Sequence, residues 1–174
     1  MKKAVMIIAS KNFRDEEYFI TKEVLKKGGV LVKTACDKPK AVGKFGGEAE
    51  ADILINDLKI DEFDAIILPG GSGASELLDN ELTYSIVKDA FYKKKLVAAI
   101  CIAPTILARA GILEGKNATV WSSSLDKSAI NILRENGATY TRKEIVIDGN
   151  IITGENAEFS QEFGETILRE LTKS

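Results

Sequence analysis

Hydrophobic positions along the chain follow two alternating patterns. Short, nearly continuous apolar runs, of which "KAVMIIAS" is the first, are typical of strands buried on both faces. Between these runs, apolar residues recur at helical spacing, as in "DEEYFITKEVLKKGG", where acids stand first, lysines follow and two glycines end the segment. Because strands and helices alternate, the sequence predicts repeated βαβ units, and therefore a mainly parallel sheet with helices on both faces.

The individual elements are assigned by residue range. The apolar runs predict strands at 3–10, 30–36, 62–71, 96–101 and 117–123, of which 62–71 ends in a turn. Helical spacing predicts helices at 15–29, 81–95, 103–113, 124–137 and 158–174. Turn residues in 40–57 predict a hairpin or an excursion from the sheet edge, and 138–154 is expected to form strands around a "DGN" turn.

The composition narrows the class of protein without identifying its function. The chain has 174 residues, a net charge of −2 and interspersed acids and bases. We therefore expect a single domain, residues 1–174, with no electrostatic attraction for nucleic acid or an anionic membrane. No apolar run is long enough to span a bilayer, and the short run in "MKKAVMIIAS" is interpreted as a first strand rather than a signal peptide.

The cysteine and histidine content limits further which kinds of protein this chain can be. The chain has two cysteines, Cys36 and Cys101, and no histidine. This set provides neither a disulfide framework nor the spacing of a zinc site, so we expect no metal and no other cofactor. A cytoplasmic, reducing location is the default expectation for such a chain. Cys36 ends a predicted strand and is given only a structural role.

In parallel sheets, ligands bind at the carboxyl ends of the strands, and three sequence features fall there. They are "SKNFRDEE" after the first strand, "PGGSGAS" after the strand at 64–68, and Cys101 after the strand at 96–100. The glycine-rich "GGSG" lacks both the G-K-[ST] ending of a phosphate loop and the G-x-G-x-x-G spacing of a dinucleotide site. Nucleotide binding is therefore not expected.

Cys101 lies between a buried run and a predicted helix, where a sharp turn can present a nucleophile at the top of a sheet. Ala98, Ala99 and Ala103 give the small neighbours that such a turn needs, and Pro104 suits the first helical turn. At a helix N-terminus the thiolate of Cys101 is expected to be favoured, and backbone N–H groups can bind an oxyanion. The residues leave open a second interpretation, in which Cys101 is one more buried apolar side chain.

The segment "AAICIAPTILARAGILEGKNAT" resembles the nucleophile-elbow segment of the ThiJ/PfpI superfamily. Further segments are similar to the family in the same order over nearly the whole chain: "FRDEEYFITKEVLKKGG", "GKFGG", "DEFDAIILPGG", "NGATY" and "IVIDGNIITG". The resemblance implies a flavodoxin-like α/β sandwich of three layers with a reactive elbow cysteine. It also implies assembly as a homodimer or a higher homo-oligomer.

The same resemblance implies a set of site residues. Cys101 matches the family cysteine, and Glu17 matches the acid that contacts it, with Glu16 only one residue away. The family's glycine pair corresponds to Gly70 and Gly71, and its oxyanion donors to Gly71 and Ile102. A protonated carboxyl can donate a hydrogen bond to a thiolate, whereas a charged carboxylate would raise the thiol pKa. The residue types alone fit equally well a solvated acid at the start of a helix and a tight "PGG" turn.

The chain departs from the family where histidines are expected. Ile102 stands where protease-like members have a histidine directly after the cysteine, and Trp121 stands where other members have one. In addition, Glu155-Asn156-Ala157 replaces the Arg-Gly-Pro of one branch. Because a general base typically contributes about 10²–10⁴ in rate, these departures argue against peptidase, deglycase and glyoxalase chemistry.

The sequence therefore supports three functions. The preferred one is a redox-responsive or stress-protective protein whose Cys101, assisted by Glu17, is oxidised to sulfenic or sulfinic acid. The alternatives are a cysteine-dependent hydrolase or deglycase/glyoxalase-type enzyme and a non-catalytic small-molecule binding module. A small aldehyde or an oxidant is the expected partner. Trp121 and Phe13 are candidates to line an apolar pocket beside the thiol, although Trp121 is better explained as a strand core residue.

Overall fold

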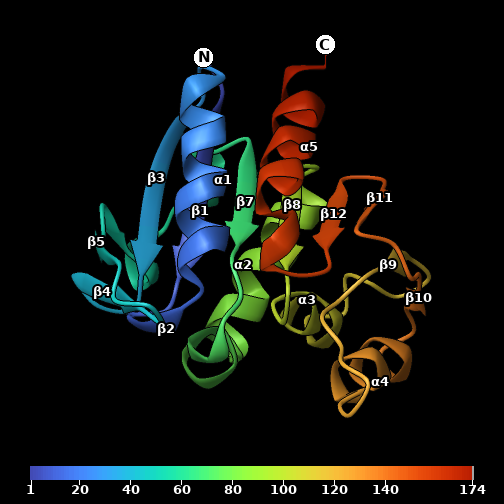
Figure 1. Cartoon of the computed structure of the whole chain (residues 1–174). Helices are drawn as coiled ribbons and strands as arrows, with labels where there is room; N and C mark the ends of the chain where they lie inside the picture. Colours follow the sequence, from blue (N-terminus) through green and yellow to red (C-terminus); the bar gives the residue numbers. More distant parts are fainter. Residues whose placement is uncertain (174) are drawn as a thin grey trace.

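A central sheet organises the computed structural model, which describes residues 1–173 (Figure 1). Within these residues the sheet has seven strands in the order β11-β12-β8-β7-β1-β3-β6. Their bounds are β1 (Lys3–Ile8), β3 (Leu31–Cys36), β6 (Ile53–Leu54), β7 (Ala65–Leu68), β8 (Leu96–Ile100), β11 (Ile145–Asp148) and β12 (Ile151–Gly154). Every neighbouring pair is parallel except β11 and β12. The predicted mainly parallel sheet is confirmed.

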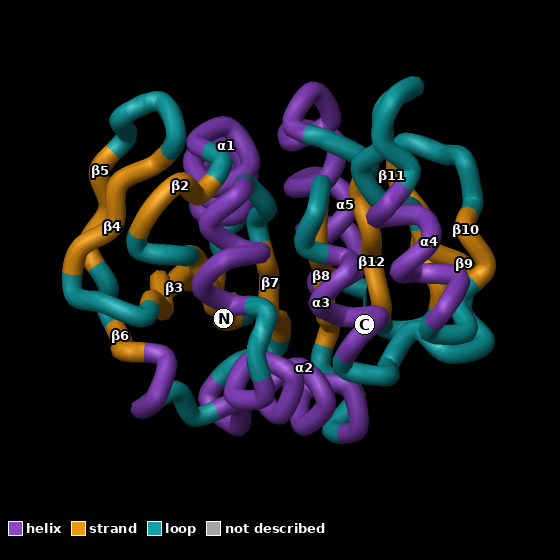
Figure 2. The backbone as a smooth tube through the Cα atoms, turned by 90° about the horizontal axis from the view of Figure 1, so that it is seen from below, coloured by secondary structure: helices purple, strands orange, loops and turns teal. Residues whose placement is uncertain are grey.

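Helices cover both faces of this sheet. Their bounds are α1 (Asp15–Lys27), α2 (Glu81–Tyr92), α3 (Pro104–Arg109), α4 (Ser128–Glu135) and α5 (Ser160–Thr172). Figure 2 shows α1 and α5 together on one side of the strands and α2 on the other. Successive residues of β1 explain this arrangement, since Met6 packs with the α1 and α5 side chains and Ile7 packs with those of α2 and α3.

A smaller sheet lies beside the start of α1. It is formed by β2 (Lys11–Phe13), β4 (Lys40–Gly43) and β5 (Glu48–Glu50), with β4 and β5 antiparallel. The hairpin predicted within 40–57 is therefore present. The Asp15 carboxylate accepts the N–H groups of Phe45 and Gly47 at 2.9 and 2.8 Å, so the β4–β5 turn is attached to the first turn of α1.

Several predicted boundaries are wrong for local reasons. The helix expected at 103–113 ends at Arg109, close to Gly111, which has a positive φ of 86°. The strand expected at 117–123 is only β9 (Asn117–Ala118), paired with β10 (Thr139–Tyr140). The helix expected at 124–137 begins only at Ser128, because a turn between Ser123 and Asp126 precedes it.

Two short elements had no sequence signal, namely β2 and a π-helical turn at Ala74–Leu78. The closing helix predicted at 158–174 is observed as α5, and residue 174 lies outside the described residues. Among residues 1–173, no helix combines the length and the apolar character needed to cross a membrane.

Phe163 of α5 provides a test of this packing. Its side chain is 0% exposed and packs with Ile100 and Ile152 of the sheet. Phe163→Ala is expected to lower the free energy of unfolding by about 3–5 kcal/mol, because the change leaves a cavity in a closed core. Chemical denaturation measures the effect. Tyr92→Ala is the control, since Tyr92 is 70% exposed and should change stability by about 0.5 kcal/mol or less. Equal effects of the two substitutions would contradict the described packing.

Candidate functional site

Cys101 occupies a strained turn directly after β8. Its φ is 64°, in the left-handed region that residues other than glycine rarely adopt. The backbone around it is fixed from two sides, because the Cys101 N–H donates to Gly154 O at 3.0 Å and the Cys101 carbonyl accepts the Trp121 N–H at 2.9 Å. The Cys101 side chain is partly exposed. The sharp strand-to-helix turn predicted at this position is therefore present.

Glu17 enters the site from α1. Its side chain is 0% exposed, and its Oε1 accepts the Gly70 N–H at 2.7 Å. Its Oε2 is buried and has no hydrogen-bond partner among residues 1–173. Glu16, by contrast, is partly exposed and forms an ion pair with Arg14 at 2.9 Å. The structure thus decides between the two neighbouring acids, and Glu17 is the one beside Cys101.

Gly70 and Gly71 follow β7. Gly70 lies next to Cys101 and Glu17, and Gly71 lies next to the backbone of residues 12–14. A Cβ on Gly70 would lie 2.9 Å from both the Cys101 Cβ and the Glu17 Oε1. Any side chain at position 70 would therefore displace the thiol, the carboxyl or both. Gly71 has a φ of 98°, and a Cβ there would lie 2.4 Å from Asn12 O. The "PGG" turn is thus required both by available space and by backbone conformation.

Burial controls the ionisation of Glu17. It raises the pKa of this carboxyl to about 8, and this effect exceeds the opposing effects of the Gly70 N–H and the Arg14 charge. Glu17 therefore holds its proton near neutral pH. Because Oε1 already accepts a hydrogen bond, the carboxyl can place its proton on Oε2 and donate it toward the neighbouring thiol.

The expected preference for the Cys101 thiolate is wrong. Burial raises the pKa of the Cys101 thiol above its ordinary value, and the charged form of Glu17 raises it further, while the Ile102 N–H opposes both effects. Helix α3 has only six residues, so the helix dipole does not outweigh the burial of the sulfur. While Glu17 holds its proton, its repulsion is absent and burial is the main cause of the raised pKa of the Cys101 thiol.

The two expected oxyanion donors lie on adjacent turns. Gly71 follows Gly70, whose position adjoins the Cys101 Cβ, and the Ile102 N–H is directed toward the Cys101 sulfur. Within residues 1–173, no carbonyl accepts the N–H of Gly71 or of Ile102. Both donors are therefore free to bind an oxygen attached to the sulfur or to its adduct. Their role in binding an oxyanion stays a prediction.

The two pocket residues predicted from sequence are placed differently. Phe13 is 1% exposed and packs edge-on against Tyr18, with 5.3 Å between the ring centroids, so it belongs to the core and does not line a pocket. Trp121 is only partly buried and belongs to neither hydrophobic core. The core interpretation of Trp121 is wrong because β9 ends at Ala118 and the chain then runs past the elbow.

Arg14 is a site neighbour that the sequence analysis missed. Its N–H donates to Gly70 O at 3.0 Å, and its guanidinium lies 5.0 Å from the centre of the Phe45 ring. Its positive charge lowers the pKa of both the Glu17 carboxyl and the Cys101 thiol. In the sequence, Arg14 immediately precedes the acidic run of "FRDEE". Its position next to Glu17 could therefore have indicated a cation at the site.

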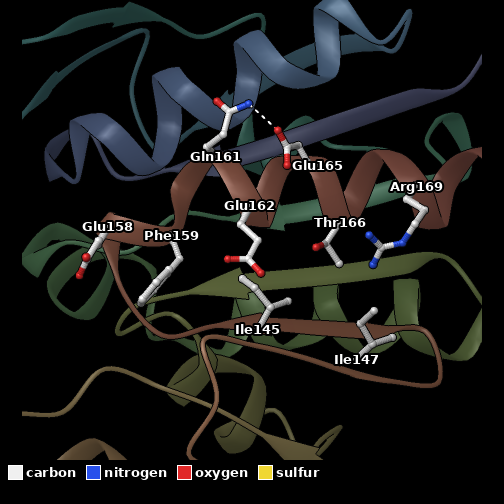
Figure 3. Close-up of a pocket in the computed structure, with 9 residues that line it drawn as sticks. All are labelled: Ile145, Ile147, Glu158, Phe159, Gln161, Glu162, Glu165, Thr166 and Arg169. Carbon is white, nitrogen blue, oxygen red and sulfur yellow. Dashed lines mark hydrogen bonds between the residues drawn. The ribbon is translucent and has the colours of Figure 1, made fainter.

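A large hollow of the surface lies away from Cys101. It is a groove of about 640 Å³ between β11 and α5, where Ile145 and Ile147 face Glu162, Thr166 and Arg169 (Figure 3). Neither Cys101 nor Glu17 lines it. Among residues 1–173, no group of three or more His, Cys, Asp or Glu side chains is placed to hold a metal ion. The chemistry available near Cys101 is therefore that of a thiol, a carboxyl, a guanidinium and backbone N–H groups.

Known proteins are similar to this chain over most of its length. The sequence profile of the DJ-1/PfpI family matches residues 2–170. An uncharacterized protein from Methanocaldococcus jannaschii is 38% identical over 174 residues, which covers 99% of this chain and 83% of the relative. Deglycase PfpI from Pyrococcus furiosus is 32% identical over 150 residues, with 86% of this chain and 87% of the relative covered.

The fold is also shared with solved structures. A ThiJ/PfpI domain protein from Brachyspira murdochii has a TM-score of 0.91 at 29% identity, covering 97% of this chain and 95% of that protein. The predicted α/β sandwich with helices on both faces is therefore confirmed by the observed layers and by this likeness.

The raised pKa of Glu17 predicts how stability depends on pH. The folded protein keeps this proton up to about pH 8, whereas the unfolded chain releases it near the ordinary value of 4.5. Stability should therefore fall as pH rises from about 4.5 to 8, by up to about 1.4 kcal/mol per pH unit. Glu17→Gln has no carboxyl at this position, so this part of the pH dependence of stability should be absent. Urea unfolding of both proteins at several pH values measures the difference, and parallel pH profiles would contradict the assignment.

Proposed function

This chain belongs to the DJ-1/PfpI family, and from that premise we propose that Cys101 is a redox-responsive thiol with a stress-protective role. The observation that carries the proposal is the buried Glu17 carboxyl beside Cys101, whose Oε2 lacks a hydrogen-bond partner among residues 1–173. A protonated Oε2 is a donor, and an oxygen added to the sulfur would be its acceptor. A cytoplasmic, reducing location suits such a thiol because it keeps the resting form reduced.

The proposed reaction takes place in two oxidation steps. The Cys101 thiolate attacks one oxygen of a peroxide, the S–O bond forms, the O–O bond breaks, and hydroxide leaves with the electron pair. A second peroxide adds another oxygen in the same way and gives the sulfinate, with release of water. Glu17 Oε2–H and the N–H groups of Gly71 and Ile102 then donate to the sulfinate oxygens.

The absence of histidine favours this reaction over hydrolysis. Hydrolysis of an ester or amide needs a group that takes a proton from the nucleophile and returns it to the leaving group, and histidine usually does this near neutral pH. The chain has no histidine. Oxidation requires only that the thiol lose its proton to solvent before it attacks.

Peroxide treatment tests the proposal. Mild hydrogen peroxide is expected to add about 32 Da, two oxygens, to the peptide that contains Cys101. Cys36 should stay unmodified because it is buried. The rate should rise with pH, since burial raises the pKa of the Cys101 thiol and the thiolate is the reacting form. Mass spectrometry of digested protein measures both, with Cys101→Ser as the control. Oxidation of Cys36 in preference to Cys101 would overturn the proposal.

Two substitutions at position 17 distinguish the effect of the Glu17 hydrogen bond on oxidation from the effect of its side-chain volume. Glu17→Gln keeps a donor beside the sulfur, whereas Glu17→Leu removes it. The sulfinate yield at fixed peroxide should fall about tenfold in Glu17→Leu and less in Glu17→Gln, because a hydrogen bond to a charged acceptor contributes about 1.5–3 kcal/mol. Trp121 is the only tryptophan, and its backbone N–H donates to the Cys101 carbonyl, so its fluorescence provides a second readout.

Aldehyde processing is the second candidate function, supported by the 32% identity to deglycase PfpI from Pyrococcus furiosus. Methylglyoxal turnover is expected to be about 10²–10⁴-fold slower than in that relative, the factor that a general base typically contributes. Kinetic assays of both proteins side by side measure this ratio. Cys101→Ala should abolish any turnover and Cys36→Ala should retain it. Turnover equal to that of the relative would show that this site needs no histidine and would make aldehyde chemistry the preferred function.

A further inference from the structure

We propose that Arg14 forms a carboxylate-binding subsite at the mouth of the Cys101 site, so that the thiol reacts preferentially with small electrophiles that carry a carboxylate. This inference rests on the proposed reactivity of Cys101 and adds the class of ligand. It is argued from the position of Arg14, from the unused donors of its guanidinium and from the charges around it.

The Gly70-Gly71 turn connects Arg14 to Cys101. The Arg14 N–H donates to Gly70 O at 3.0 Å. A Cβ on Gly71 would lie 2.7 Å from Arg14 N, and a Cβ on Gly70 would lie 2.9 Å from the Cys101 Cβ. Two consecutive glycines thus contact the Arg14 backbone on one side and the nucleophile on the other. The Arg14 side chain starts from this backbone, and its positive charge lowers the pKa of the Cys101 thiol.

Glu16 holds the Arg14 guanidinium in place but does not use all of its hydrogen-bond donors. Its Nε and Nη2 both bind the same oxygen of Glu16, each at 2.9 Å. A guanidinium has five N–H donors, and among residues 1–173 no acceptor other than Glu16 contacts this one. The side chain is 31% exposed. Its remaining donors are therefore accessible to an incoming carboxylate, which arginine binds through paired hydrogen bonds.

Phe45 restrains the guanidinium from a second direction. The Arg14 guanidinium carbon lies 5.0 Å from the centre of the Phe45 ring. This ring is on the β4–β5 turn, which the Asp15 carboxylate attaches to α1 by two hydrogen bonds. The contact reduces the number of positions that the long Arg14 side chain samples, so less conformational entropy is lost when an anion binds.

Charged groups of both signs lie around Arg14. Lys44 Nζ lies 5.6 Å from the Phe45 ring and adds a second cation to the rim. Glu17 holds its proton near neutral pH, and Asp15 is engaged by the two N–H groups of the turn. Glu16 is the charged acid in direct contact with Arg14, so it is the group with which a bound carboxylate would compete.

Two alkylating reagents test this subsite directly. Iodoacetate and iodoacetamide bring the same carbon to the sulfur and differ in carrying a carboxylate or a neutral amide. In both reactions the S–C bond forms, the C–I bond breaks, iodide leaves with the electron pair, and the thiol proton passes to solvent. Because the thiolate fraction is common to both reagents and their intrinsic difference in reactivity is constant, a change between variants in the ratio of the two rate constants at Cys101 reports recognition of the carboxylate. Mass spectrometry of the Cys101 peptide gives both rates.

The variants are expected to move this ratio in opposite directions. Arg14→Gln should lower the ratio of iodoacetate to iodoacetamide about threefold to tenfold, the range expected for a partly exposed charged hydrogen bond. Arg14→Lys should retain part of the wild-type preference for iodoacetate. Glu16→Gln should raise it, because the guanidinium loses its competing partner. Arg134→Gln, a change of the same charge on α4, is the control and should leave the ratio unchanged. High salt should reduce the wild-type ratio toward that of Arg14→Gln.

The outcomes separate this proposal from the proposed function. If Cys101 reacts normally with iodoacetamide and neither Arg14→Gln nor Glu16→Gln changes the ratio, the carboxylate subsite is overturned and the redox role of Cys101 still stands. If Cys101 of the wild-type protein reacts with neither reagent, both proposals are overturned. Glu16→Gln leaves Arg14 itself intact, so the pair of variants stays decisive even if Arg14→Gln lowers stability.

Discussion

The site depends on one buried hydrogen bond, from the Gly70 N–H to Glu17 Oε1. It joins α1 to the turn after β7, and therefore fixes the position of the carboxyl relative to the thiol at the end of β8. Since Oε1 is occupied by this donor, the proton of the carboxyl is left for Oε2, which has no hydrogen-bond partner among residues 1–173. The bond thus sets both the geometry of the site and the direction in which it can donate.

Much of the architecture could be predicted because the residues of each strand and helix carry its pattern themselves. Apolar runs identified the sheet, and the small residues and proline around Cys101 identified the elbow. Glu17 came from the family resemblance, since Glu16 and Glu17 are equivalent in residue type and only burial distinguishes them. The ionisation of Cys101 could not be predicted, because it is set by desolvation from residues distant in the sequence. Phe13 and Trp121 were misplaced because their burial likewise depends on residues distant in the sequence, whereas Arg14 stands beside the acids in the same segment and was given no role.

Loss of histidine and the presence of Arg14 together change the chemistry that this site can support. Histidine would offer a base near neutral pH, whereas arginine offers a permanent positive charge and several fixed donors. Such a site has no imidazole to transfer protons, and burial also disfavours the thiolate of Cys101 itself. The backbone N–H groups of Gly71 and Ile102 have no carbonyl partner among residues 1–173. In the proposed functions, these donors would bind an anion formed on the sulfur, and Arg14 would bind an anion brought by a ligand.

The left-handed backbone of Cys101 has a consequence for how this position tolerates change. A residue with a Cβ in that conformation is less stable by about 1–3 kcal/mol than an unstrained one, and glycine would relieve the cost. Folding alone thus disfavours cysteine at the position where the proposed function requires a thiol. Randomly accumulated substitutions at residue 101 would drift toward glycine if the sulfur had no use, so the identity of this one residue serves as a marker of whether a descendant of this chain still needs its thiol.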